Sequence, residues 1–217
     1  MKNNEQGEEQ TIKLAEDMEK SFSYVNDFSK ATNLRLYILE HSLHVEELVS
    51  TALGYILEID WKKSKSFGYS SVSLSFNQKA LIIQDLKGLD KNDIEKLSCF
   101  MAIRNKFAHV KSVNTFEDFF NSGKNGSDVK KSLIKFYPIE NSIIDDDLKF
   151  KISFFRLFLD ICTFLLSKVL KHEYERGRKD FSKEYFSSIL TELGNIEVGE
   201  EILKRALTRT KVNLNID

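Results

Sequence analysis

The sequence predicts an all-α protein, and three observations support this prediction. The 217 residues contain a single proline, Pro138, and only 9 glycines, so few positions interrupt a helix. Apolar residues recur every three or four positions through most of the chain, which places them on one face of a helix. Hydrophobic residues make up 41% of the composition, enough for a sizeable core. We therefore expect a bundle of helices.

The charge balance limits the partners that the chain can attract through its whole surface. Charged residues reach 30%, yet the formal net charge is only −1. A general attraction to nucleic acid is therefore excluded, and any contact with RNA requires a local basic patch.

Two features predict a cytoplasmic protein that does not enter a membrane. The N-terminus is polar and acidic and lacks the basic and then apolar pattern of a signal peptide. The longest apolar run, residues 152–170, contains charged residues, so it predicts a core helix rather than a membrane span. Cys99 and Cys162 lie in apolar helical patterns, and we interpret them as buried core residues.

Three regions follow one another along the chain. Residues 1–29 are a polar tail and a helix from about Glu8, residues 30–177 form the main helical domain, and residues 178–217 form a C-terminal helical appendage. The main domain opens with a long helix from Leu34 to Glu58. Residues 60–74 are rich in Ser and Lys and predict a loop.

His41 and His44 lie three residues apart on this long helix, with Glu40 and Glu47 nearby. A metal site would require all the ligands on one face at short distances. We predict no metal site, and we expect both histidines on the helix surface or at a dimer contact.

The next two helices have clear start signals. Ser75 is a plausible N-cap for a helix over 76–87, with Gly88 as its stop. Asp90 is predicted to cap the following helix, with Asp93 in the capping-box position, and that helix runs to about Lys111.

Shorter elements are predicted after this helix. Thr115 begins a short helix that ends at Phe120, and residues 121–127 are the clearest turn in the chain. A helix over 128–136 follows, and Pro138 marks a break.

Residues 145–147 are three aspartates that precede the most apolar helix, which is predicted from Leu148 to about Tyr174. We interpret them as acids that complement the helix dipole rather than as a metal cluster. Two helices, at about 182–193 and 197–208, complete the C-terminal appendage.

The sequence Arg104-Asn105-Lys106-Phe107-Ala108-His109 is the stretch that most plainly suggests chemistry. Phe107 and the apolar residues before it are expected to face the core, whereas Asn105 and His109 share a second face. Histidine exchanges protons near neutral pH, arginine fits phosphate oxygens, and asparagine orients a neighbour. The simpler alternative is that Arg104 pairs with an acidic residue and that His109 caps the helix end.

These six residues resemble the Arg-(polar)-x-x-x-His motif of HEPN domains, an all-helical superfamily. Residues 75–83, Arg35 and residues 45–48 are similar to the branch of that superfamily that includes mannitol operon repressor-like proteins. The resemblance covers residues 30–172 and implies a HEPN-like helical bundle, here with additional N- and C-terminal helices.

The resemblance implies a metal-independent endoribonuclease that cleaves RNA, such as tRNA or mRNA, at a site shared by a homodimer. It implies a toxin or phage-defence effector that an antitoxin or defence-system partner protein restrains. Arg104, Asn105 and His109 would be the catalytic residues, and Glu46 or Glu47 would support Arg104.

From the charge of their side chains, Lys106 and Lys111 are expected to bind RNA phosphate. We predict no cofactor. The alternatives are a non-catalytic regulatory or protein-interaction module like the mannitol repressor-like proteins, and a nucleotide-handling enzyme with a nucleotidyltransferase partner.

Overall fold

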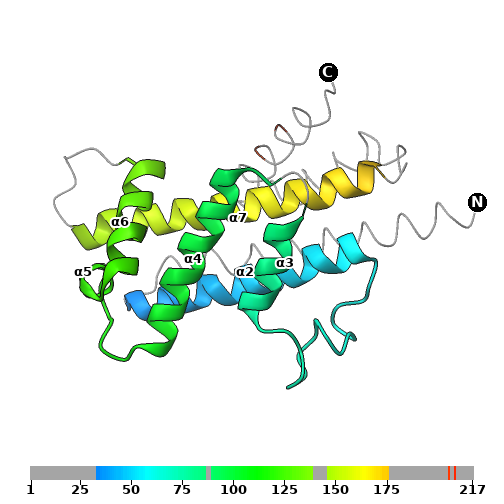
Figure 1. Cartoon of the computed structure of the whole chain (residues 1–217), viewed down its shortest axis with the longest axis horizontal. Coiled ribbons are helices and arrows are strands. Elements are labelled where there is room, and N and C mark those ends of the chain that lie inside the picture. The colour runs from blue at the N-terminus through cyan, green and yellow to red at the C-terminus, as the bar shows by residue number, and fades with distance from the viewer. Residues whose placement is uncertain (1–32, 87–88, 139–145, 176–204, 206–207, 209–217) are drawn as a thin grey trace, which may run out of the picture. The chain divides into compact units, whose positions relative to one another are not determined.

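The computed structural model of the chain describes residues 33–86, 89–138 and 146–175, together with residues 205 and 208 (Figure 1). These residues form helices and no strand, so the all-α prediction is confirmed for this part of the chain. The predicted N-terminal helix and, apart from Arg205 and Thr208, the predicted C-terminal helices lie outside the described residues. The helices are α2 (Leu34–Leu57), α3 (Phe76–Asp85), α4 (Lys91–His109), α5 (Phe116–Asn121), α6 (Lys124–Phe136) and α7 (Asp146–Glu175).

The chain divides into two compact units. One unit comprises residues 31–162, and the other joins residues 1–30 to residues 163–217. The first unit contains α2 to α6, the beginning of α7 and every residue of the motif on α4. The division falls within α7, before the predicted end of the main domain at residue 177.

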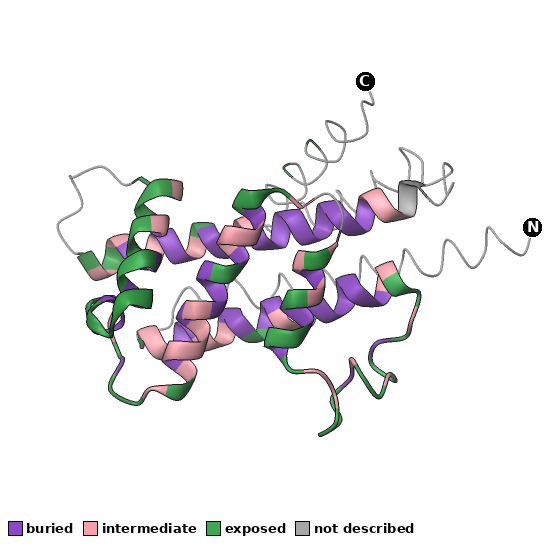
Figure 2. Cartoon of the chain, in the orientation of Figure 1, coloured by how far each residue is buried: buried purple, intermediate pink, exposed green. Residues whose placement is uncertain are grey.

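The core of the 31–162 unit is built largely from aromatic side chains. Phe100 of α4 stacks on Phe154 of α7 with ring centroids 5.3 Å apart, and Phe107 meets the ring of Phe116 at 5.9 Å. The buried residues of α4 include the predicted apolar face, namely Leu97, Phe100, Ile103 and Phe107. Burial extends along α2 and α4, whereas α6 is mostly exposed (Figure 2). Cys99 and Cys162 are both buried and free, as predicted.

The predicted helix starts are confirmed by their caps. The Ser75 hydroxyl accepts a hydrogen bond from the backbone amide of Gln78, and the Gln78 side-chain oxygen accepts one from the backbone amide of Ser75. Together these two bonds form a capping box. Asp90 accepts from the amide of Asp93 at 2.8 Å, and Thr115 caps α5 in the same way. Each cap satisfies an amide that has no partner within the helix, so the local sequence alone places these starts.

The expectation for the two histidines of α2 was wrong, because α7 covers the face on which they lie. His41 is 1% exposed and His44 is 6% exposed. The ring of Phe158 lies 4.8 Å from the His41 ring and 5.9 Å from the His44 ring. Both imidazoles are therefore core groups and not surface ligands.

The predicted turn at 121–127 was also partly wrong, because α6 begins at Lys124 and includes Gly126. Gly123 stands at the N-cap with φ 124°, a conformation that glycine adopts without strain. A Cβ atom at Gly126 would lie 2.2 Å from the carbonyl oxygen of Phe119. This glycine therefore permits close packing of α5 against α6 rather than a turn.

The acidic start of α7 has a role beyond its own helix. Asp146 and Asp147 lie in the first turn, which fits the predicted complement to the helix dipole, although α7 starts two residues earlier than expected. The Asp147 carboxylate also accepts from the backbone amide of Phe116 at 3.0 Å, so it ties the start of α5 to α7. The preceding helix, α6, ends at Phe136, two residues before Pro138, as predicted.

Candidate functional site

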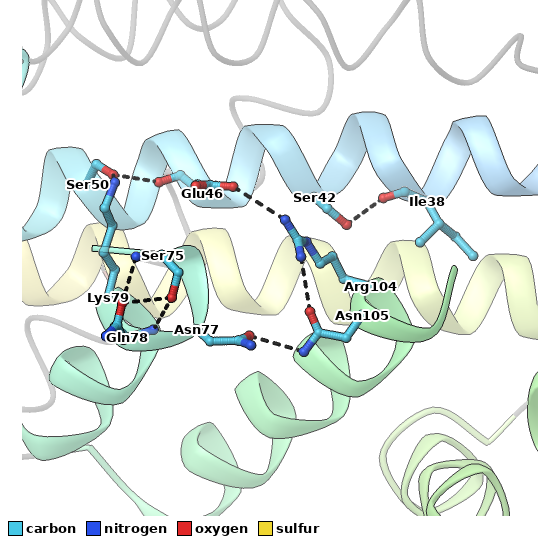
Figure 3. A network of polar contacts seen from close by, with 10 residues as sticks. All are labelled: Ile38, Ser42, Glu46, Ser50, Ser75, Asn77, Gln78, Lys79, Arg104 and Asn105. Atoms are coloured by element: carbon cyan, nitrogen blue, oxygen red, sulfur yellow. Dashed lines mark hydrogen bonds and ion pairs between the residues drawn. The ribbon is translucent and has the colours of Figure 1, made fainter. Parts of the chain in front are cut away.

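The guanidinium of Arg104 lies at the centre of a polar network on α2, α3 and α4 (Figure 3). Its Nη1 donates to the Asn105 side-chain oxygen at 3.1 Å, and its Nη2 lies 3.8 Å from the carboxylate of Glu46. Its central carbon lies over the Phe76 ring, 5.6 Å from the ring centroid. The Arg104 side chain remains 24% exposed, so three neighbours orient a cation that solvent still reaches.

The structure distinguishes between the two glutamates that sequence considerations could not separate. Glu46 faces Arg104 across the contact between α2 and α4, whereas Glu47 is exposed. Successive residues of a helix point about 100° apart, so only one of the pair can face α4.

Asn77 also belongs to this network, although no sequence pattern predicted it as a site residue. It lies in the first turn of α3, and its side-chain oxygen accepts from the Asn105 amide group at 3.1 Å. The Ser75 cap indicates where α3 begins, but nothing local indicates that this end of α3 meets α4. Asn77 and Phe76 therefore make α3 a second wall of the site.

A buried lysine lies on the far side of Glu46. Lys79 is 4% exposed, and its ammonium group donates to the Ser50 hydroxyl at 3.0 Å (Figure 3). The same ammonium group donates to the Phe67 carbonyl at 2.9 Å. Burial lowers the pKa of Lys79, while the charge of Glu46 opposes this shift. Glu46 therefore interacts electrostatically with two cations, the buried Lys79 and the partly exposed Arg104.

His109 is the last residue of α4 and is exposed to solvent. It does not take part in the network around Arg104, whose described contacts are with Glu46, Asn105 and Phe76. His109 is five positions after Arg104 in the helix, which places the two side chains roughly 140° apart around the helix axis. Within one chain the imidazole and the guanidinium thus face different directions.

Arg35 of α2 holds the segment that follows His109. Its Nη2 donates to the Val110 carbonyl at 2.5 Å and to the Val113 carbonyl at 2.8 Å. Arg35 is one of the residues that carry the family resemblance, but its contact with this turn was not predicted.

The two lysines expected to bind phosphate differ in their surroundings. Lys106 donates to the backbone carbonyl of Ser122 at 3.4 Å and is partly exposed, whereas Lys111 is exposed. Both lie within three residues of His109, so positive charge accompanies the imidazole at this end of α4. The described residues contain no group of three or more His, Cys, Asp or Glu side chains that is placed to hold a metal ion.

Comparisons with known proteins do not extend this description. No model of a protein family, no curated protein and no solved structure matches the chain. None of the described helices has the length and apolar character that crossing a bilayer requires. The function of this site is therefore inferred from its own residues.

Proposed function

We propose that the chain is a HEPN-like bundle and a metal-independent endoribonuclease that acts as a homodimer. The observation that carries this proposal is the arrangement of the six-residue motif on α4. Arg104 is oriented by Glu46 and Asn105 yet reachable by solvent, and the same helix ends in a solvent-facing His109.

The proposed reaction needs only groups that RNA and these side chains provide. The 2′-hydroxyl attacks the adjacent phosphorus, the bond to the 5′-oxygen breaks, and the products carry a 2′,3′-cyclic phosphate and a 5′-hydroxyl. His109 accepts the proton of the 2′-hydroxyl or, when protonated, donates one to the leaving 5′-oxygen. Arg104 binds the scissile phosphate and stabilises the charge that develops on its oxygens. Asn105 keeps the guanidinium in place.

A second copy of the chain would solve the geometric problem that one copy leaves. Arg104 and His109 face different directions on α4, so a composite site would combine the arginine of one protomer with the histidine of its partner. Two exposed leucines on α2, Leu36 at 51% and Leu43 at 67%, lie seven residues apart and hence on one side of the helix. Leu43 is one turn before Glu46, so this apolar strip adjoins the site and is suited to self-association.

The test is cleavage of total RNA or tRNA in the presence of a chelator. We expect the wild-type protein to yield fragments with 2′,3′-cyclic phosphate ends, and Arg104→Ala and His109→Ala to lose this activity. Asn92→Ala changes an exposed residue at the start of the same helix and serves as the matched control. Equal cleavage by wild type and His109→Ala, or none by either at high concentration, would contradict the proposal.

Mixing the two inactive variants tests the composite site directly. In a mixed dimer of Arg104→Ala with His109→Ala, one site has both wild-type groups and the other has neither. We therefore expect mixing to restore up to half of the activity in the mixed dimers. Absence of any restoration, although mixed dimers form, would show that both groups act from one chain.

The second candidate function is a non-catalytic regulatory module. Its support is that the Arg104 guanidinium already has an anionic and an amide partner within the chain, as a purely structural arginine would. A nuclease of this kind should harm the cell that expresses it unless a partner protein restrains it, and changing Arg104 or His109 should relieve the harm. A regulator should be harmless in every form.

A further inference from the structure

The turn after His109 is hydrogen-bonded to the start of α2, which lies far from it in the sequence. Arg35, in the first turn of α2, reaches across 75 residues to the Val110 carbonyl and across 78 residues to the Val113 carbonyl. Both contacts come from the same nitrogen, Nη2, and the guanidinium is partly buried. A charged donor at this place complements the negative end of α4, where the last carbonyls have no helical partner.

This turn is compact and directly follows the motif. The Val110 amide donates to the Lys106 carbonyl at 2.9 Å, which closes the last turn of α4. The Val113 amide donates back to the Val110 carbonyl at 3.1 Å, and the Val113 side chain is 2% exposed. Arg35 therefore bridges the carbonyl of Val110, the C-cap residue that directly follows His109, and the carbonyl of Val113 in the same turn.

We propose that Arg35 is a positioning residue for His109, an inference that rests on the proposed ribonuclease function. His109 is exposed, so side-chain packing does little to restrict its backbone, and the end of a helix frays unless its carbonyls are satisfied. Arg35 supplies that restraint from α2, which also supplies Glu46 to Arg104. One helix thus holds both halves of the motif, the arginine through its side chain and the histidine through the backbone of the turn that follows it.

The fold should survive removal of this contact, which makes the inference testable. Phe107 and Phe116 flank the turn, are fully buried, and anchor it from both sides. Arg35→Met keeps the apolar stem and removes the donors. Arg35→Lys keeps one ammonium group that can donate to both carbonyls. Arg156→Met, at an exposed position of α7, is the matched control for loss of an arginine.

Two measurements are made on the full-length protein: amide hydrogen exchange of the peptide that covers 105–113, and the cleavage of tRNA in chelator under saturating and subsaturating conditions. We expect Arg35→Met to accelerate exchange at 110 and 113 about tenfold and to lower kcat by about tenfold, as loss of charge-assisted bonds implies. KM should change little, because Arg104 still binds phosphate. Arg35→Lys should restore most of kcat, and Arg156→Met should match wild type.

The outcomes separate the inference from the function beneath it. Unchanged exchange in Arg35→Met would overturn the inference whether or not the protein cleaves RNA. Faster exchange with an unchanged kcat would also overturn it, while the ribonuclease function would stand. Inactivity of the wild-type protein would refute the ribonuclease function, and the positioning role would fail with it.

Discussion

The two buried histidines of α2 make the stability of this protein depend on pH in a calculable way. Burial lowers the pKa of His41 from 6.5 to about 4. The hydrogen bond from His41 to the Tyr37 carbonyl opposes this shift, and the charge of Lys151 lowers the pKa further. Burial likewise lowers the pKa of His44 to about 4, and the neighbouring His41 adds to the shift. The Nε2 atom of His44 is buried and has no hydrogen-bond partner among the described residues.

The sign of the effect follows from which state binds the proton first. The unfolded chain protonates each histidine as the pH falls through 6.5, whereas the folded chain resists until about pH 4. The stability is therefore fully present above pH 6.5 and is lost as the pH falls from there to about 4. By pH 5 each histidine should have removed about 2 kcal/mol from the free energy of unfolding, or about 4 kcal/mol for the pair.

The assay is urea unfolding at pH 7.5, 6.5, 5.5 and 5.0, followed by the fluorescence of the single tryptophan, Trp61, which is 6% exposed. The wild type is compared with the double variant His41→Phe/His44→Leu, which keeps apolar volume against Phe158. Between pH 7.5 and pH 5.0, the free energy of unfolding of the wild type should decrease by about 4 kcal/mol more than that of the variant. Parallel curves for the two proteins over this range would refute the reasoning.

Three further changes test the packing and the site. Gly126→Ala should destabilise the protein by about 1–3 kcal/mol, because a Cβ atom would meet the last-turn carbonyls of α5, while Asn125→Ala beside it should be nearly neutral in thermal unfolding. Phe154→Ala should lower the free energy of unfolding in urea by about 3–5 kcal/mol, since the ring is fully buried; a loss below about 1 kcal/mol would contradict the described core. Asn77→Ala should leave the thermal midpoint nearly unchanged but lower RNA cleavage by about tenfold, because the Asn105 amide loses its partner on α3; unaltered cleavage would remove Asn77 from the site.

Much of the helical layout was predictable because its signals are local. The polar caps at Ser75, Asp90 and Thr115 satisfy amides a few residues away, so their effect does not depend on the rest of the fold. The apolar spacing of α4 likewise predicted which of its side chains are buried. The predictions were wrong where a residue contacts a segment that is distant in the sequence. Gly126 was predicted to form a turn because its contact with α5 cannot be inferred from the adjacent residues.

In the candidate site, too, the features set by nearby residues were predictable and those set by distant contacts were not. The spacing of Arg104, Asn105 and His109 was evident in the sequence, and an acidic partner on α2 was expected. The choice of Glu46 over Glu47, and the contribution of Asn77, depend on how α2, α3 and α4 meet. These contacts join residues far apart in the chain, so periodicity and capping carry no information about them.

By itself the sequence determined that the described part of this protein is helical, where most of its helices start, and which side of α4 is apolar. It determined these features because helix periodicity and capping act over a few residues. Only the tertiary structure decided that His41 and His44 are buried, that Glu46 faces Arg104, and that Arg35 holds the turn beyond His109. Those features depend on the directions in which whole helices cross, and many distant side chains set those directions together.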